Sequence, residues 1–296
     1  MPISNVRCLA TCVALVMSFA QAASAADILV TDAKSQPESI TIAPGGVLIA
    51  GSASSPFVYK IPAGSSTAEK FIDVTSEGPG TFFYGMLADA SSKTLWTCQV
   101  GPVPGTTPVQ HRSALRGFDL FTGAPKLRWD LPGDSNTCND LSLGPDGTLY
   151  FTDTPKGRIF ALPAGATSAD LFLDNHILVG IDGITFVNGV LYVNNVITSR
   201  IYRIPVDPSG NALAPIEITL DKPIKGPDGM RAANGKLFVA ENGGGKITVI
   251  DLSGDTGTVT VLKDGLSHPT AIEPAGDTLW YSERAIGMVH SMPLPK

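Results

Sequence analysis

The segment NDLSLGPDGTLYFTDTPKGRIFALP, residues Asn139–Pro163, carries the clearest signal of the fold. Its leucines alternate with polar residues, Pro145–Gly147 is typical of a tight turn, and an apolar stretch follows at once. A second turn at Gly157 leads into a third apolar stretch. This pattern predicts a short antiparallel meander. Its beginning is unusual, because Asn139 and Asp140 are residue types that β-strands disfavour.

Five other segments repeat this pattern along the chain. They begin at Glu38, Gly85, Asp182, Asp228 and Thr270, and with Asn139 the six beginnings are 42 to 54 residues apart. A period of this length, with several strands in each repeat, is typical of a β-propeller. The six beginnings therefore predict an all-β fold, a six-bladed β-propeller with four-stranded blades.

The two ends of the repeat array predict how the ring closes. The last repeat ends after its third strand, at Pro295–Lys296, whereas the stretch DILVTDA, Asp27–Ala33, precedes the first repeat. This stretch resembles the outermost strands of the other repeats. We therefore expect the N-terminal strand to become the fourth strand of the last blade, where it closes the ring and covers an exposed edge.

The first residues of the chain predict export. Arg7 is followed by an apolar stretch and then by Ala23–Ala25, the small-residue pattern at which signal peptides are cleaved. We interpret residues 1–25 as a signal peptide and residues 26–296 as one propeller domain. The protein is then expected to be periplasmic or secreted.

The charge of the chain bears on its partners. The formal net charge is −6, removal of Arg7 with the signal peptide makes it one unit more negative, and the sequence has no basic cluster. Such a chain is poorly suited to bind nucleic acid or an anionic membrane. We expect a small-molecule substrate and a monomer.

The polar beginnings of the repeats predict a metal site. Alignment puts Glu38, Asn139, Asp182 and Asp228 at the first position of an inner strand, and these positions converge at one mouth of the channel of a propeller. Three carboxylates that meet there would repel one another when they are desolvated. Carboxylate and amide oxygens are the ligands that Ca²⁺ prefers. An Asp-Gly or Asn-Asp pair can also serve a turn alone, but four such residues in one register favour the metal site.

The repeats, the Asn139–Asp140 pair and the "GPDGM" motif around Asp228 resemble the senescence marker protein/gluconolactonase (regucalcin-like) family of six-bladed propellers. Paraoxonases and strictosidine-synthase-like proteins are similar to a lesser degree. The resemblance covers Asp27–Met292. It implies one Ca²⁺, or another divalent cation such as Zn²⁺, Mg²⁺ or Mn²⁺, held by Glu38, Asn139, Asp182 and Asp228. Asp182 stands where the family commonly has Asn.

The same resemblance implies an activity, the metal-dependent hydrolysis of lactones or related esters. The cation would polarise the carbonyl group, and a carboxylate would activate water. Asp228 takes the position of the family's catalytic base. Sugar-lactonase members carry a substrate-binding Arg two residues before the Asn of the Asn-Asp pair, where this chain has Thr137. This difference puts a preference for aldonolactones in doubt.

Further candidates for substrate binding lie in loops on the same face. The insertion Gly101–Leu115 carries His111 and Arg112 and could act as a lid or be a passive surface loop. His268 and His176 lie in loops that enter blades six and four and could move a proton or only be solvated. The residues at equivalent second-strand ends could support the ligands or bond to neighbouring loops: Gln99, Asp153, Asn195, Glu241 and Glu283.

Two cysteines remain once the signal peptide is removed. Cys98 lies at the end of the second strand of blade two, and Cys138 directly precedes Asn139. An oxidising compartment favours a disulfide between them, although two separate buried thiols are the alternative. For the function as a whole, the alternatives to a hydrolase are a propeller that binds a small ligand or peptide without catalysis, and a lyase on the same scaffold.

Overall fold

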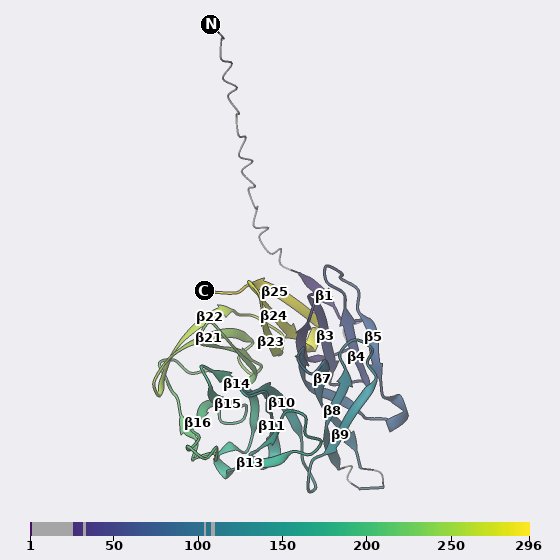
Figure 1. Ribbon diagram of the computed structural model, residues 1–296, viewed down its shortest axis with the longest axis horizontal. Helices are drawn as coiled ribbons and strands as arrows, with labels where there is room; N and C mark the ends of the chain where they lie inside the picture. The colour runs from purple at the N-terminus through teal and green to yellow at the C-terminus, as the bar shows by residue number, and fades with distance from the viewer. Residues whose placement is uncertain (2–25, 32–33, 104, 108–109) are drawn as a thin grey trace.

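The computed structural model describes residues 1, 26–31, 34–103, 105–107 and 110–296, which form a ring of six β-sheets around a central channel (Figure 1). The predicted six-bladed β-propeller is therefore confirmed. Apart from Met1, the expected signal peptide lies outside the described residues. Within those residues, no helix has the length and apolar character that a membrane crossing requires.

In the first four blades the strands follow one another outward from the channel. Blades one and two consist of β2 (Pro37–Ala43), β3 (Val47–Ser52), β4 (Phe57–Ile61), β5 (Glu69–Asp73), β6 (Phe82–Asp89), β7 (Thr94–Pro102), β8 (His111–Asp119) and β9 (Pro125–Asp130). Blades three and four consist of β10 (Cys138–Leu143), β11 (Leu149–Asp153), β12 (Arg158–Leu162), β13 (Asp170–Asp174), β14 (Ile181–Val187), β15 (Val190–Asn195), β16 (Arg200–Ile204) and β17 (Ile216–Glu217).

The last two blades depart from this simple order. Blade five consists of β19 (Pro227–Ala233), β20 (Lys236–Glu241), β21 (Lys246–Ser253), β22 (Thr256–Lys263) and an added strand β18 (Thr219–Leu220). Blade six consists of β23 (Pro269–Ala275), β24 (Thr278–Glu283), β25 (Met288–Pro293) and β1 (Asp27–Leu29). Short 3₁₀ helices lie between strands: η1 (Thr75–Glu77), η2 (Thr154–Lys156), η3 (His176–Leu178) and η4 (Arg284–Ile286).

The fifth strand of blade five was not predicted. β17 pairs with β16 of blade four over two residues only, and the chain then runs on as β18, which pairs in parallel with β22. The amide of Thr219 donates to the carbonyl of Asp255 at 2.9 Å, and that of Asp221 donates to Gly257 at 3.0 Å. The connection between the two blades therefore satisfies its backbone groups on the outer edge of the next blade.

The ring closes as predicted. β1 pairs antiparallel with β25, with Asp27 opposite His290 and Leu29 opposite Met288. Ile28, the middle residue of β1, is buried and packs with core residues of blade one, such as Ile40 and Leu48. The N-terminal and C-terminal strands therefore lie in one sheet (Figure 1).

The core lies between neighbouring blades. The alternating leucines and aromatics of the third repeat face inward, so that Leu141 and Phe151 are fully buried. Trp129 of blade two packs edge-on against Phe151 and Phe160, with ring centroids 5.7 and 5.3 Å apart. Such contacts bury the apolar face that no blade can cover by itself.

A buried ion-pair cluster joins the inner strands at the axis. Arg231 of β19 makes two bonds to Asp140 of β10, at 2.7 and 3.0 Å, and one to Glu273 of β23 at 3.2 Å. The guanidinium also reaches the carbonyl of Met86 on β6 at 3.4 Å. Asp140, the second polar residue of the opening segment, therefore ties blade three to blade five. Burial raises the pKa of Glu273 to about 7, although the charge of Arg231 opposes the shift.

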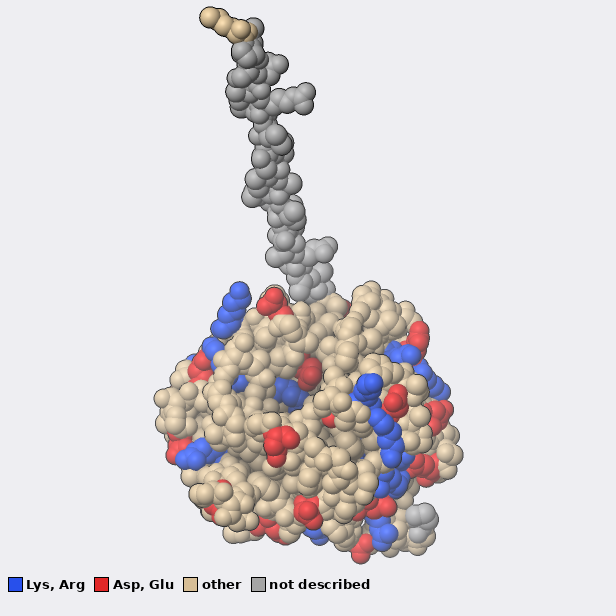
Figure 2. Space-filling view, viewed as in Figure 1, with Lys and Arg blue, Asp and Glu red and all other residues tan. Residues whose placement is uncertain are grey.

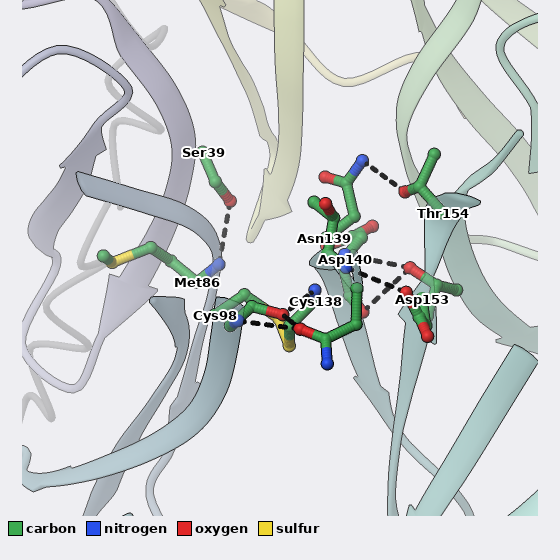
Figure 3. The surroundings of a disulfide bond; sticks show 12 residues. Ser39, Met86, Cys98, Cys138, Asn139, Asp140, Asp153 and Thr154 are labelled. Carbon is green, nitrogen blue, oxygen red and sulfur yellow. Dashed lines mark hydrogen bonds between the residues drawn. A yellow bond between two sulfur atoms is a disulfide. The ribbon is translucent and has the colours of Figure 1, made fainter. Parts of the chain in front are cut away.

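A disulfide links blades two and three. Cys98 on β7 and Cys138 on β10 are fully buried and bonded, with their Cα atoms 5.1 Å apart (Figure 3). The bond closes a loop between positions 40 residues apart in the sequence. It lies directly beside Asn139, so it restricts the backbone from which that side chain extends.

The disulfide leads to two expectations, one for the alkylation of thiols and one for the free energy of unfolding. Alkylation of the unfolded, unreduced chain that begins at Ala26 should add no label, whereas two labels should be added after reduction. Replacement of Cys98 and Cys138 by alanine should lower the free energy of unfolding by about 3–4 kcal/mol, the chain-entropy value for a loop of this length. Two labels without reduction would show that the thiols are free.

Glu273 predicts a pH dependence of stability. Its pKa is higher in the folded chain than its ordinary value of 4.5, so its stabilising contribution is present below pH 4.5 and is lost as the pH rises through about 7. Glu273→Gln stays neutral and avoids this loss. Its stability relative to the wild type should increase by about 3 kcal/mol between pH 4.5 and pH 8, measured by urea unfolding. The matched variant Glu69→Gln, at an exposed position of β5, should show no such increase. Equal behaviour of the two variants would contradict the prediction.

Candidate metal centre

Glu38, Asn139, Asp182 and Asp228 surround one small pocket at the inner strands. They come from four different blades, and Gly85 and the neighbourhood of Thr270 supply the wall from the other two. Figure 2 shows a hollow at the centre of the ring in which acidic and basic side chains are visible. The structure therefore brings together all four residues that the sequence singled out as ligands.

A bulge places each of these side chains. The pairing of the inner strand with the second strand shifts register at the polar position in every blade: the shifts lie between Pro37 and Ile40, Phe83 and Met86, Cys138 and Leu141, Ile181 and Ile184, Pro227 and Met230, and Pro269 and Ile272. A bulge adds an unpaired residue and turns its side chain away from the regular alternation. In blade two this position is Tyr84, one residue before the beginning that the repeats predicted, and in blade six it is Thr270. The bulge explains how the other four blades accommodate a strand-disfavoured residue here.

The glycine that follows Asp182 and the one that follows Asp228 are required by a close approach of neighbouring strands. A Cβ atom on Gly183 would lie 2.5 Å from the carbonyl oxygen of Asp228, and one on Gly229 would lie 2.5 Å from that of Thr270. Neighbouring inner strands approach too closely for any side chain at these positions. The "PDG" sequence at Pro227–Gly229 thus lies inside β19 and forms no turn, unlike the same letters at 145–147.

Polar residues of the second strands hold the backbone of the next ligand. The hydroxyl of Thr152 donates to the carbonyl of Asp182 at 2.9 Å. In the next blade, the amide Nδ2 of Asn194 donates to the carbonyl of Asp228. The positions of Asp182 and Asp228 are therefore each held by the blade that precedes them, so the geometry of the pocket depends on contacts between blades.

The three carboxylates carry uncompensated negative charge. Glu38, Asp182 and Asp228 are 6 to 7% exposed. Burial raises the pKa of all three, and the negative charges of Glu38 and Asp182 raise the pKa of Asp228 further. The same charges and burial raise the pKa of Tyr84 to about 12. The pocket is therefore an environment that favours a cation.

Two cations of the protein lie at or beside the pocket. Arg231 lines it but is paired with Asp140. Nη1 of Arg284 donates to Oε2 of Glu38 at 2.7 Å, and its charge opposes the rise in the pKa values of Glu38, Asp182 and Asp228. With all three acids ionised, Arg284 leaves two formal negative charges. A divalent cation carries the charge that would balance them.

The donors around the pocket fit a hard cation. Nδ2 of Asn139 donates to Oδ2 of Asp182 at 2.9 Å and to the hydroxyl of Thr154 at 3.0 Å (Figure 3 draws the second bond). Because Nδ2 is engaged in this way, Oδ1 is the atom of Asn139 that can bind a metal. Three carboxylates and one amide oxygen make an all-oxygen set of the kind that Ca²⁺ prefers. Among the described residues, however, no three His, Cys, Asp or Glu side chains form a ready-made metal centre.

Sequence reasoning missed the residues that support the ligands. These are Thr154, Asn242 and Arg284, which bond to Asn139, Asp228 and Glu38 respectively. Each comes directly after the end of a second strand. The alternation of a strand turns successive side chains to opposite sides, so the residue after the strand end reaches the pocket. In three repeats a polar residue directly follows the second strand, and this recurrence in the sequence could have predicted the role.

The strand-end residues themselves bond elsewhere. Asp153 accepts from the amide of Thr137 at 2.8 Å and pairs with Arg158. The remaining four bond to neighbouring loops or side chains: Gln99 to Glu77, Asn195 to Val179 and Ile197, Glu241 to Lys225, and Glu283 to Ser267. Of the two roles that the sequence left open for these residues, the structure therefore shows bonding to neighbouring loops and not support of the ligands.

The candidate substrate-binding residues are not among those that line this pocket. Thr137 is half-buried just before β10. The two ends of the expected insertion loop are instead part of the β7–β8 hairpin: β7 continues to Pro102, and His111 is the first residue of β8. Arg112 is exposed, pairs with Asp134 at 3.0 Å, and lines a separate cavity of about 510 Å³. A role of these residues in substrate binding stays a prediction.

His268 is connected to the pocket through one residue. It is exposed, and its Nδ1 lies 2.9 Å from Oδ1 of Asn242, whose Nδ2 donates to Oδ2 of Asp228 at 2.9 Å. His176 is also exposed and begins η3.

Solved structures resemble this fold at low sequence identity. A structural-genomics target classed provisionally as a gluconolactonase superposes with a TM-score of 0.68 at 17% identity, over 92% of this chain and 93% of its own. The calcium-binding protein regucalcin from Agrobacterium tumefaciens gives 0.65 at 18%, over 89% and 92%. Virginiamycin B lyase from Staphylococcus aureus gives 0.64 at 16%, over 92% and 99%. At these identities the likeness establishes the fold alone.

A search of curated protein sequences finds no match. The sequence model of one family, described as the SMP-30/Gluconolactonase/LRE-like region, matches residues 111–282, more than half of the chain. This match agrees with the six-bladed fold and with the resemblance seen in the repeats. The chain belongs to the SMP-30/gluconolactonase/LRE-like family.

Proposed function

We propose that the protein is an exported, metal-dependent hydrolase of lactones or related esters. The observation that carries this proposal is the meeting of three buried carboxylates and one amide from four blades around a single pocket. Buried charges are costly unless a partner compensates them, so such a cluster marks a functional site. Membership of the family supports the reaction class.

Glu38, Asn139, Asp182 and Asp228 would hold one divalent cation, of which Ca²⁺ fits the oxygen donors best. When bound, the cation supplies Lewis acidity that polarises the substrate carbonyl. The protein contributes the orientation of the donors, since hydrogen bonds hold the four ligand side chains and the backbones of Asp182 and Asp228. Arg284 leaves one oxygen of Glu38, Oε1, for the cation.

Asp228 is the carboxylate that we assign as general base. Its Oδ2 accepts from Asn242, so the lone pairs of Oδ1 are left both to bind the cation and to receive a proton from water. Burial and the nearby acids raise its pKa, which makes it a stronger base than an exposed aspartate. Metal ligation would lower the pKa of Asp228. The strength of Asp228 as a base therefore depends on the balance between burial and ligation.

The substrate is proposed to be a small molecule with an ester or lactone carbonyl. Thr137 provides no positive charge at the position where sugar lactonases of the family carry Arg, which disfavours aldonolactones. We further propose that the protein acts as a monomer in the periplasm or outside the cell, without a nucleic-acid or membrane partner. The acidic composition and the N-terminal leader pattern support this.

A panel of lactones and esters, assayed with and without chelator in ¹⁸O-labelled water, tests the proposal. Hydrolysis should place one ¹⁸O atom in the carboxylic acid product, and it should stop when EDTA is added and return with CaCl₂. CaCl₂ should also raise the melting temperature, because a ligand of the folded state stabilises it by mass action. A product with a new double bond and no ¹⁸O would indicate a lyase. No turnover with any compound would favour a binding protein. An unchanged melting temperature and activity after chelation would exclude the metal.

Two substitutions separate the base from the ligands. Asp228→Asn should lower kcat by at least about 100-fold, because the amide cannot accept the proton of water, yet calcium affinity measured by calorimetry should fall much less. Asp182→Asn keeps an oxygen donor and a hydrogen-bond acceptor for Asn139, so kcat should stay within about 10-fold of the wild type. Near-normal turnover of Asp228→Asn would remove Asp228 from the role of base.

A further inference from the structure

Two hydrogen bonds in series connect an exposed histidine to the pocket. His268 lies in the loop before β23, and its Nδ1 is 2.9 Å from Oδ1 of Asn242. Nδ2 of Asn242 is in turn 2.9 Å from Oδ2 of Asp228. Asn242 follows β20 of blade five and His268 precedes β23 of blade six, so the series joins neighbouring blades beside the candidate base.

The chemistry of the three groups assigns the protons. An ionised carboxylate only accepts hydrogen bonds, so Asn242 must present its NH₂ group to Asp228 and its Oδ1 to His268. Oδ1 of an amide only accepts, so Nδ1 of His268 must carry the proton. A neutral His268 is then the Nδ1–H tautomer. Asp228 therefore sets the orientation of the Asn242 amide, and the Nδ1–H tautomer of His268 is the one that agrees with it.

The backbone at His268 is held in a rare conformation. Its φ is +54°, a region that residues other than glycine seldom adopt. Two hydrogen bonds hold it there: the amide of Ser267 donates to Glu283 at 2.6 Å, and the carbonyl of His268 accepts from Arg284 at 3.1 Å. Gln36, Gly180 and Gly226, which directly precede three other inner strands, also have a positive φ, so this conformation belongs to the loops of the fold and sets the place of the His268 side chain.

We propose that His268 is a positioning residue that acts through Asn242 to fix the Asp228 carboxylate for metal binding. The Nδ1–H group of His268 keeps the amide of Asn242 in the orientation that donates to Oδ2 of Asp228, and Oδ1 of Asp228 is left for the cation. Partners of this kind orient a ligand without touching the metal. The inference rests on the proposed function, because it assumes that Asp228 is a ligand.

Calcium affinity of the chain that begins at Ala26, measured by calorimetry with CaCl₂, tests this role. His268→Leu removes the donor, and His268→Gly removes it while also relieving the positive φ. His268→Asn keeps a donor near the place of Nδ1 and tolerates the same φ. The first two variants should weaken binding at least about 10-fold, and His268→Asn should stay within about 2-fold of the wild type. His176→Leu, at another exposed loop histidine, should have no effect.

A double-mutant cycle separates positioning from a general effect on the loop. In the Asn242→Leu background, His268→Leu should cause no further loss of calcium affinity, because the link through which it acts is already broken. Additive losses, a full effect of His268→Asn, or no effect of His268→Gly would each overturn the proposal.

The ring tautomer gives a readout that needs no metal. In ¹⁵N-histidine-labelled protein, His268 should be the Nδ1–H tautomer at neutral pH and should lose this preference in Asn242→Leu. The signals of the four histidines of the chain can be assigned with the variants. An Nε2–H tautomer in the wild type would overturn the positioning role. A wild type that has the Nδ1–H tautomer but binds no calcium, magnesium, manganese or zinc would overturn the metal-binding function and, with it, the metal-positioning role of His268, although the hydrogen-bonded arrangement would stand.

Discussion

The convergence of six inner strands on one axis is the constraint on which the rest of the structure depends. At the pocket the strands approach so closely that Gly183 and Gly229 have room for no side chain, and the bulges turn the preceding residues toward one another. Carboxylates at these positions cannot separate, since each is fixed by its own blade. Their repulsion is therefore built into the ring, and it can be relieved only by a positive charge, whether that of Arg284 or of a bound ion.

Two groups of charges adjoin the pocket and are compensated differently. Arg231 binds Asp140 twice and Glu273 once, so most of the charge of this group is balanced within the protein. By contrast, Arg284 is the cation that bonds to the group formed by Glu38, Asp182 and Asp228, which contains three acids. Asn139 and Asp140 are adjacent in the chain and line the same pocket, yet Asp140 is paired with Arg231 whereas Asn139 bonds to Asp182. The Arg231 group ties the blades together, whereas the three acids retain the excess charge that suits the pocket to bind a cation.

Sequence periodicity predicted the blades, the closing strand and the four pocket residues, because each repeat shows the same alternation and the same polar first position. It did not predict Thr154, Asn242 and Arg284, since their contacts depend on which side of the strand end faces the axis. It also missed β18, whose two residues pair with a neighbouring blade and carry no pattern of their own. Similarly, the extended β7–β8 hairpin replaces both ends of an expected loop because cross-strand pairing continues to Pro102 and His111.

The sixth blade is assembled from both ends of the domain, and this has a consequence for the order of folding. Asp27 and His290 pair across a sequence separation of 263 residues. Contacts between such distant positions form late, because the entropy of closing so long a loop must be overcome first. A chain that emerges from the ribosome with its N-terminus first can build blades one to five in turn, but it cannot seal the ring until β25 has emerged. The pocket, which needs inner strands from all six blades, is therefore among the last parts of the structure to be completed.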